Sequence, residues 1–158
     1  MRNDMKKTFL VTILFGLISA LSFAAAKNIQ YITPVPQGGQ ISIKKSQFTK
    51  DASFINYKSG EITVQLIAVI ADDNSFRVAF NTCQSCNPAP KAYFVQQGRK
   101  LVCQNCGNQF TMNDVGSPSY GCNPARIPFT QTDSEILIST EILEKAAPAF
   151  RNWQGSVK

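Results

Sequence analysis

Histidine is absent from the 158-residue sequence. Its absence removes the commonest metal ligand of proteins, the usual general base and the usual haem ligand. Paired carboxylates are few and fall in turns. A hydrolytic mechanism therefore has little support, because no histidine base accompanies any serine or cysteine. If the protein carries out chemistry, sulfur must supply it.

Charged residues are also sparse, at 16% of the sequence against 44% hydrophobic residues. This balance is typical of an ordinary globular protein, and one domain is expected at this length. The formal net charge is +6, but the basic residues are scattered. No aromatic residues are interleaved with them, as a single-strand nucleic-acid binder would need. We therefore expect no nucleic-acid partner.

The first 26 residues are typical of a secretory signal peptide. A short basic start gives way to nineteen residues without a charge, residues 8–26, which end in three alanines. Signal peptidase accepts small residues at such a junction. An uncleaved membrane anchor through residues 8–26 is the alternative, because about 17–25 apolar residues suffice to cross a bilayer. In either case we expect residues 27–158 to form a single exported domain, periplasmic or anchored to the membrane and facing outside the cytoplasm.

Alternating apolar and polar residues predict a mainly β fold of the α+β class. In residues 62–70 the alternation fades towards the end, which indicates a strand buried on both faces. Residues 27–40 contain prolines and glycines and should form an extended lead-in. The runs that we expect to be strands are 41–43, 53–57, 62–70, 76–80, 109–112 and 135–139.

A short helix is expected near the C-terminus. Thr140 could cap a helix that runs from Glu141 to about Ala147. Pro148 should stop it, because proline lacks the backbone N–H that a continuing helix needs.

All five cysteines lie in residues 83–122. Cys83 and Cys86 form one CxxC pair and Cys103 and Cys106 form a second, sixteen residues further on. This spacing is typical of metal sites. Residues 92–95 and 100–103 flank a glycine-containing turn at 96–99, which predicts a β-hairpin that brings the two pairs face to face. We therefore expect a zinc-ribbon-like site at the edge of a small antiparallel sheet.

The residues after the two CxxC pairs support this expectation. Gly107 directly follows the second pair and Asn87 follows the first. Both residue types tolerate a left-handed backbone. That conformation would fold the chain around a metal and point amide N–H groups at the thiolates.

Several chemistries are open to these thiols. Four thiolates can hold structural zinc, or they can hold iron as a single ion or a cluster. The spacing does not separate the two metals. Disulfides are a third interpretation, because export exposes thiols to oxidising conditions, although two CxxC pairs with an odd fifth cysteine make a poor disulfide framework. A thiol oxidoreductase is also open, but the βαβ context of a thioredoxin-like site is missing.

The fifth cysteine decides among the site's possible arrangements. Cys83, Cys86, Cys103 and Cys106 would satisfy a four-thiolate site alone. Cys122 lies between Gly121 and Asn123-Pro124 in a tight loop, so we expect it to face the site. It would then be a spare thiol, an alternative ligand or the partner in a transient disulfide.

The cysteine stretch resembles the FtrD-like family of membrane iron–sulfur proteins. The resemblance covers roughly residues 76–128, with the cysteine core at 78–128. It rests on residues 78–86, 92–94, 101–107, Gly116 and the terminal Gly-Cys-Asn-Pro at 121–124. Tyr120 departs from the family, which usually has a second glycine there, and the long multi-span membrane region of the family is missing. We therefore expect a free-standing exported domain that keeps the site.

The resemblance implies an iron or iron–sulfur centre, with zinc as the alternative, and a role in electron transfer. It also implies a partner in bacterial iron uptake, either an iron-permease membrane complex or another redox protein. On this basis we expect a redox carrier or a metal-binding accessory rather than an enzyme. The candidate metal ligands are Cys83, Cys86, Cys103, Cys106 and Cys122.

Overall fold

The structure is a computed structural model that describes residues 29–118 and 121–158. In this part of the chain most regular elements are strands, arranged in one five-stranded and two three-stranded sheets. The predicted mainly β fold with a short C-terminal helix is therefore confirmed. The predicted signal or anchor, residues 1–26, lies outside the described residues. Among the residues that are described, no helix is long and apolar enough to span a membrane.

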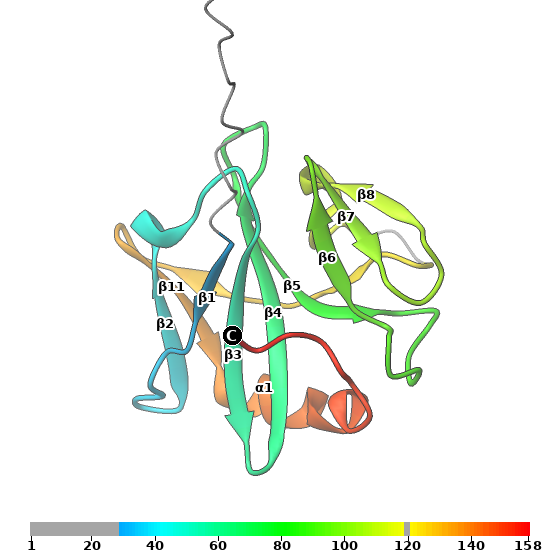
Figure 1. Ribbon diagram of the computed structural model, residues 1–158. Coiled ribbons are helices and arrows are strands. Elements are labelled where there is room, and N and C mark those ends of the chain that lie inside the picture. The colour runs from blue at the N-terminus through cyan, green and yellow to red at the C-terminus, as the bar shows by residue number, and fades with distance from the viewer. Residues whose placement is uncertain (1–28, 119–120) are drawn as a thin grey trace, which may run out of the picture.

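The five-stranded sheet forms the centre of the molecule, and Figure 1 shows a smaller sheet on each side of it. In spatial order its strands are β1 (Gln30–Ile32), β3 (Ser53–Ser59), β4 (Ile62–Ile70), β5 (Phe76–Cys83) and β9 (Pro124–Arg126). β1 runs parallel to β3, and the other neighbours are antiparallel. Three of these strands match predicted runs, whereas β1 lies in the segment expected to be only an extended lead-in.

Both faces of the central sheet are buried. On β4, Val64 and Leu66 belong to a first hydrophobic core. Ile67 and Val69, which point to the opposite face, belong to a second core. Burial on both faces explains why the alternation of apolar and polar residues fades along this strand.

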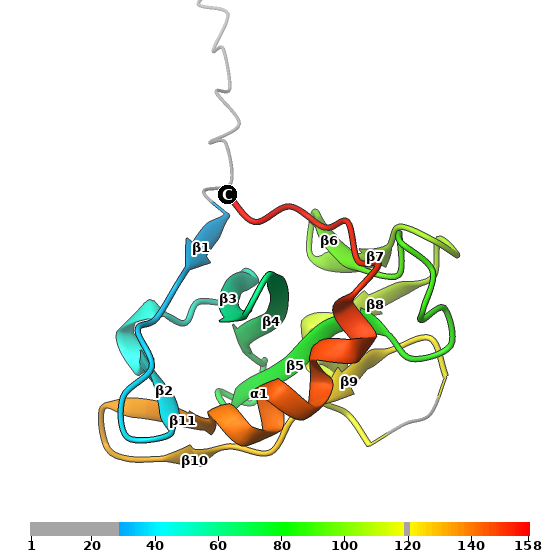
Figure 2. The same ribbon diagram turned by 90° about the horizontal axis from the view of Figure 1, so that it is seen from below.

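The first core is closed by the second sheet and by the C-terminal helical segment. That sheet has the order β10 (Thr130–Gln131), β11 (Glu135–Ser139) and β2 (Gln40–Lys44), all antiparallel. The helix α1 (Thr140–Ala146) continues into the 3-10 turn η3 (Ala147–Phe150). Figure 2 shows this segment crossing the central sheet near β5. Leu143 and Phe150 are the large apolar side chains that it buries in the first core.

The helix differs from its prediction at both ends. Its N-cap is Ser139, whose hydroxyl accepts a hydrogen bond from the amide of Glu141 at 3.2 Å. Thr140 is already helical, and its hydroxyl donates to the carbonyl of Gly39. Pro148 does not stop the helical chain but lies near the start of η3, where its missing N–H costs nothing.

The second core lies under the third sheet. This sheet is formed by β6 (Phe94–Gln97), β7 (Lys100–Cys103) and β8 (Gln109–Thr111). Phe94 and Leu101 pack with Phe54 and Ile67 of the central sheet in that core. Two 3-10 turns, η1 (Lys45–Gln47) and η2 (Met112–Asp114), follow β2 and β8. The strand predicted to reach Met112 therefore ends one residue earlier.

The hairpin predicted between the CxxC pairs is present, with a tighter turn than expected. Gln97 pairs with Lys100, which leaves Gly98 and Arg99 as a two-residue connection instead of the four residues 96–99. Such connections need a positive φ, and Gly98 supplies it at 60°. This short turn sets the register that leads β7 directly to Cys103.

Candidate metal centre

Each CxxC pair begins at the last residue of a strand that contributes to the second core. Cys83 is the last residue of β5 and Cys103 is the last residue of β7. The amide of Asn87 donates to the carbonyl of Cys83, and the amide of Gly107 donates to the carbonyl of Cys103, both at 2.9 Å. The same tight turn therefore closes both pairs.

Backbone amides point at the first sulfur of each turn, as the sequence predicted. The amide of Cys86 donates to the thiol of Cys83. The amides of Asn105 and Cys106 donate to the thiol of Cys103. Such N–H groups stabilise negative charge on sulfur in a low-dielectric surrounding.

The backbone after the two pairs differs. Gly107 has the expected left-handed conformation, with φ of 76°. The same expectation for Asn87 is wrong, because Asn74 is the one non-glycine residue with a positive φ in the described chain. Asn87 instead precedes Pro88 through a cis peptide bond. Its side-chain amide donates to the hydroxyl of Thr82 at 3.0 Å, so asparagine serves there through its side chain.

Cys122 is brought to the site by β9, a strand that the sequence analysis missed. β9 pairs with β5 so that Pro124 lies opposite Cys83. The side chain of Gln84 donates to that of Asn123 at 2.8 Å, and the thiol of Cys83 donates to the carbonyl of Cys122 at 3.4 Å. β9 begins with Pro124, which the sheet tolerates because it is the first residue of an edge strand.

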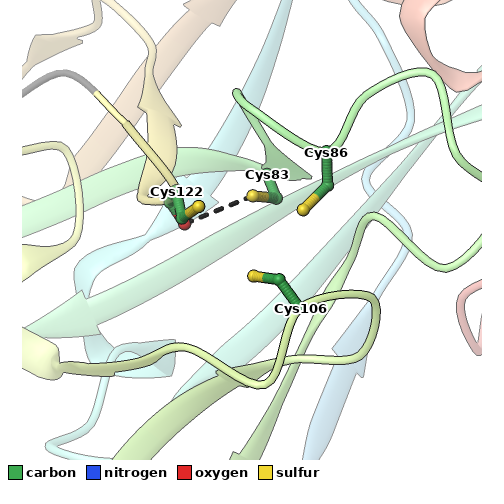
Figure 3. Close-up of side chains that lie close together, drawn as sticks. All are labelled: Cys83, Cys86, Cys106 and Cys122. Atoms are coloured by element: carbon green, nitrogen blue, oxygen red, sulfur yellow. Dashed lines mark hydrogen bonds between the residues drawn. The ribbon is translucent and has the colours of Figure 1, made fainter.

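The sulfur atoms gather in one cluster, and Figure 3 draws the cysteines of this cluster other than Cys103. Four of them, from Cys83, Cys86, Cys106 and Cys122, all lie within 4.8 Å of one another. Cys83 is buried, Cys106 is exposed, and the other two are half-buried. Cys103 lies outside this group of four but is buried beside it, with its sulfur 3.9 Å from that of Cys86. The structure thus brings all five predicted residues together and joins Cys122 to the first pair.

A family model described as membrane iron-sulfur containing protein FtrD-like matches residues 36–150. The chain belongs to the FtrD-like family. The FtrD-like match covers well over half of the chain and includes most of both cores, a wider range than residues 76–128. No curated protein and no solved structure matches the chain.

The FtrD-like family is membrane-associated, and the iron–sulfur description agrees with a cysteine cluster that could hold a metal. Tyr120, where the sequence departs from the FtrD-like pattern, lies outside the described residues. The likeness to a zinc ribbon stays a prediction.

The donor set of the FtrD-like cluster fits one metal ion. Thiolates in a tetrahedron with metal–sulfur bonds of about 2.3 Å lie about 3.8 Å apart. The observed limit of 4.8 Å between any two of the four sulfurs leaves only a small contraction on binding. In a multinuclear cluster, bridging sulfides and further irons separate the thiolates. The compact arrangement therefore favours a mononuclear site, although a tetrahedral set of four sulfurs suits iron and zinc alike.

The thiols differ in their acidity. Burial raises the pKa of Cys83 and of Cys103. Burial acts in the same direction at Cys86, but hydrogen bonds from Asn105 and from the neighbouring thiols outweigh it and hold the pKa of Cys86 below its usual value. The surroundings of Cys86 therefore favour its thiolate form more than those of Cys83 and Cys103 do. A cation in the cluster would favour deprotonation of the other ligands.

Proposed function

We propose that this FtrD-like protein is exported and holds one iron ion in its cysteine cluster, as an electron carrier or metal-binding accessory in bacterial iron uptake. The observation that carries the proposal is the group of four thiols within 4.8 Å of one another, in a family described as iron–sulfur containing. An iron-permease membrane complex or another redox protein is the proposed partner. Residues 1–26 would direct export, and residues 8–26 could attach the chain to the membrane.

In this proposal Cys83, Cys86, Cys106 and Cys122 are the ligands in the compact group, with Cys103 adjacent to them. Bound iron would supply one-electron redox chemistry. The protein's own contribution is to position the sulfurs and to donate hydrogen bonds to them, which stabilises the more negative, reduced state and raises the reduction potential.

The exposure of the site fits electron exchange with a partner. Cys106 is exposed, whereas Cys83 is buried in the second core. One side of the cluster therefore reaches the surface while the opposite side is anchored in packed protein. Electrons would enter and leave through the Cys106 side.

Structural zinc is the second candidate. The observation that favours it is the burial of Cys83 and Cys103 in the second core, because structural zinc sites are closed and stabilise small folds. A zinc-bound protein would then act as an interaction module and not as a carrier.

The test is the metal content and visible absorption of the full chain, isolated anaerobically from its exported location. We expect iron with sulfur-to-iron charge-transfer bands that bleach on reduction and return on reoxidation. Cys106→Ser should abolish the bands, whereas Ser85→Ala, in the first CxxC turn, should keep them. Stoichiometric zinc without colour would support the second candidate. Absence of both metals, with four of the five cysteines paired as disulfides, would contradict both candidates and favour a thiol–disulfide redox protein.

A further inference from the structure

The cluster holds five thiols, one more than a tetrahedral ion needs. Cys83, Cys86 and Cys106 form its common centre. Cys122 lies within 4.8 Å of each of these three. Cys103 lies beside the same three, since its sulfur is 3.9 Å from that of Cys86 and its thiol interacts with those of Cys83 and Cys106.

We propose that Cys103 and Cys122 are alternative fourth ligands of a single metal ion. Cys83, Cys86 and Cys106 would be the fixed ligands, and either Cys103 or Cys122 would supply the fourth thiolate. This inference rests on the proposed metal binding, but it concerns which residues of this chain bind and does not depend on which metal is bound.

Charge argues against five simultaneous ligands. Four thiolates already outweigh the charge of a divalent or trivalent ion, and a fifth thiolate would add an uncompensated negative charge beside the second core. One of the two cysteines therefore stays a neutral thiol. When Cys122 binds, the thiol of Cys103 can donate a hydrogen bond to Cys86 across the observed 3.9 Å. When Cys103 binds, the half-buried Cys122 stays the neutral thiol.

The two candidates approach the ion from different elements. Cys103 is held in the β6–β7 ladder opposite Phe94, and its side chain is 1% exposed. Cys122 precedes the three-residue edge strand β9 and is half-buried. A fifth thiol next to a four-coordinate ion provides an associative route for ligand exchange, in which the incoming sulfur binds before the outgoing sulfur leaves. During this exchange the ion would stay on the three fixed thiolates, and the Cys122 side is where a metal could be loaded or passed to a partner.

The test uses Co²⁺ added anaerobically to the reduced full chain, since its sulfur charge-transfer absorption reports how many thiolates bind. The variants are Cys103→Ser, Cys122→Ser and the double variant, with Cys86→Ser as the variant that removes a fixed ligand. Serine keeps the side-chain size but is a poor ligand beside soft thiolates. Fluorescence of Trp153, the single tryptophan, checks that each metal-free variant is folded.

We expect each single variant at Cys103 or Cys122 to bind one Co²⁺ with the absorption of four thiolates. The double variant and Cys86→Ser should bind more weakly by over about 100-fold, beyond the loss typical of outer-shell changes. If one of the two single variants alone loses the four-thiolate absorption, that cysteine is a fixed ligand and the inference is wrong. Undiminished binding by the double variant would also overturn it. A wild-type chain that binds no Co²⁺ would overturn the proposed metal binding itself.

A second measurement does not need the double variant to fold. In the metal-loaded wild type, an alkylating reagent should modify Cys122 in part, because Cys103 can replace it on the metal. In loaded Cys103→Ser, Cys122 should be protected, because it is then the sole fourth ligand. Equal modification of Cys122 in the two loaded proteins would contradict the exchange.

Discussion

Gly107 shows how a single residue outside the ligand set shapes the cluster. Its φ of 76° is in the left-handed region, and a Cβ added there would meet nothing within 4 Å. The requirement for glycine is therefore one of backbone conformation and not of space. Its amide closes the turn from which Asn105 and Cys106 donate to the thiol of Cys103.

Replacing Gly107 with alanine should destabilise the metal-free protein by about 1–2 kcal/mol, the cost of a left-handed L-residue. It should also weaken Co²⁺ binding, because relaxation of the turn moves Cys106. Gly98→Ala is the matched control, since Gly98 also has a positive φ and open space but lies at the far end of the hairpin. Denaturant unfolding and Co²⁺ titration measure the two effects. Equal Co²⁺ affinities of the two variants would show that the Gly107 turn does not position the ligands.

The two turns also show what single residues reveal in advance. A glycine directly after CxxC is used for its left-handed backbone, and this was predicted for Gly107. Asparagine has two uses, a left-handed backbone or a hydrogen-bonding side chain. Asn87 takes the second, and one of its acceptors is the carbonyl of Ala149, 62 residues away. No local pattern could have revealed a partner at that distance.

At the scale of the elements, one carboxylate on α1 accepts hydrogen bonds from the central sheet. Glu144 accepts hydrogen bonds from the hydroxyls of Tyr57 and Ser59 on β3. These hydrogen bonds lower the pKa of Glu144. The hydrogen bond to Glu144, followed by burial and by the negative charge of Glu144, raises the pKa of Tyr57 from 10.0 to about 12.

Replacing Glu144 with glutamine should lower the pKa of Tyr57 from about 12 towards its ordinary value of 10.0. The folded state holds the phenol proton more tightly than the unfolded state, so this contribution is complete below pH 10 and is lost as the pH rises towards 12. The difference in thermal stability between wild type and variant should therefore shrink across that window. Ultraviolet titration of tyrosinate and thermal unfolding measure it.

Glu141→Gln is the control on the same helix, because Glu141 forms its ion pair with Lys145 in solvent. It should leave the tyrosinate titration unchanged. An unaltered Tyr57 pKa in Glu144→Gln would mean that the Tyr57 hydroxyl does not form the hydrogen bond with Glu144 that joins β3 to α1.

The elements that the sequence predicted and missed differ in what determines them. Long strands such as 62–70 and the CxxC hairpin have their own periodicity and turn residues, and both were found. β1, β9 and β10 have three residues or fewer. Strands this short exist because a neighbouring strand offers backbone hydrogen bonds, so they depend on tertiary context. The sequence predicted that Cys122 faces the site, but not that β9 would place it, instead of Cys103, in the compact group of four.

At the scale of the whole molecule, the cysteines belong to one of two cores. Cys83 and Cys103 are members of the second core, with Cys86 and Cys122 packed against it. Among the described residues of the first core there is no cysteine. Metal binding should therefore stabilise one side of the central sheet more than the other.

Hydrogen exchange of the full chain with and without metal tests this asymmetry. Removal of the metal should reduce the protection of amides in β6, β7 and β8. Amides in β2, β11 and α1 should change little, because the first core holds them without the cluster. A uniform loss of protection in both cores would instead show that the two sides unfold as one cooperative unit.

The most direct test of the central claim is the ratio of iron and inorganic sulfide to protein in the anaerobically isolated full chain. The compact group of four thiols predicts one iron per chain and no inorganic sulfide, because the sulfurs lie within 4.8 Å of one another and leave room for a single ion. Two or more irons accompanied by inorganic sulfide would contradict a mononuclear site and require the cluster to open on assembly.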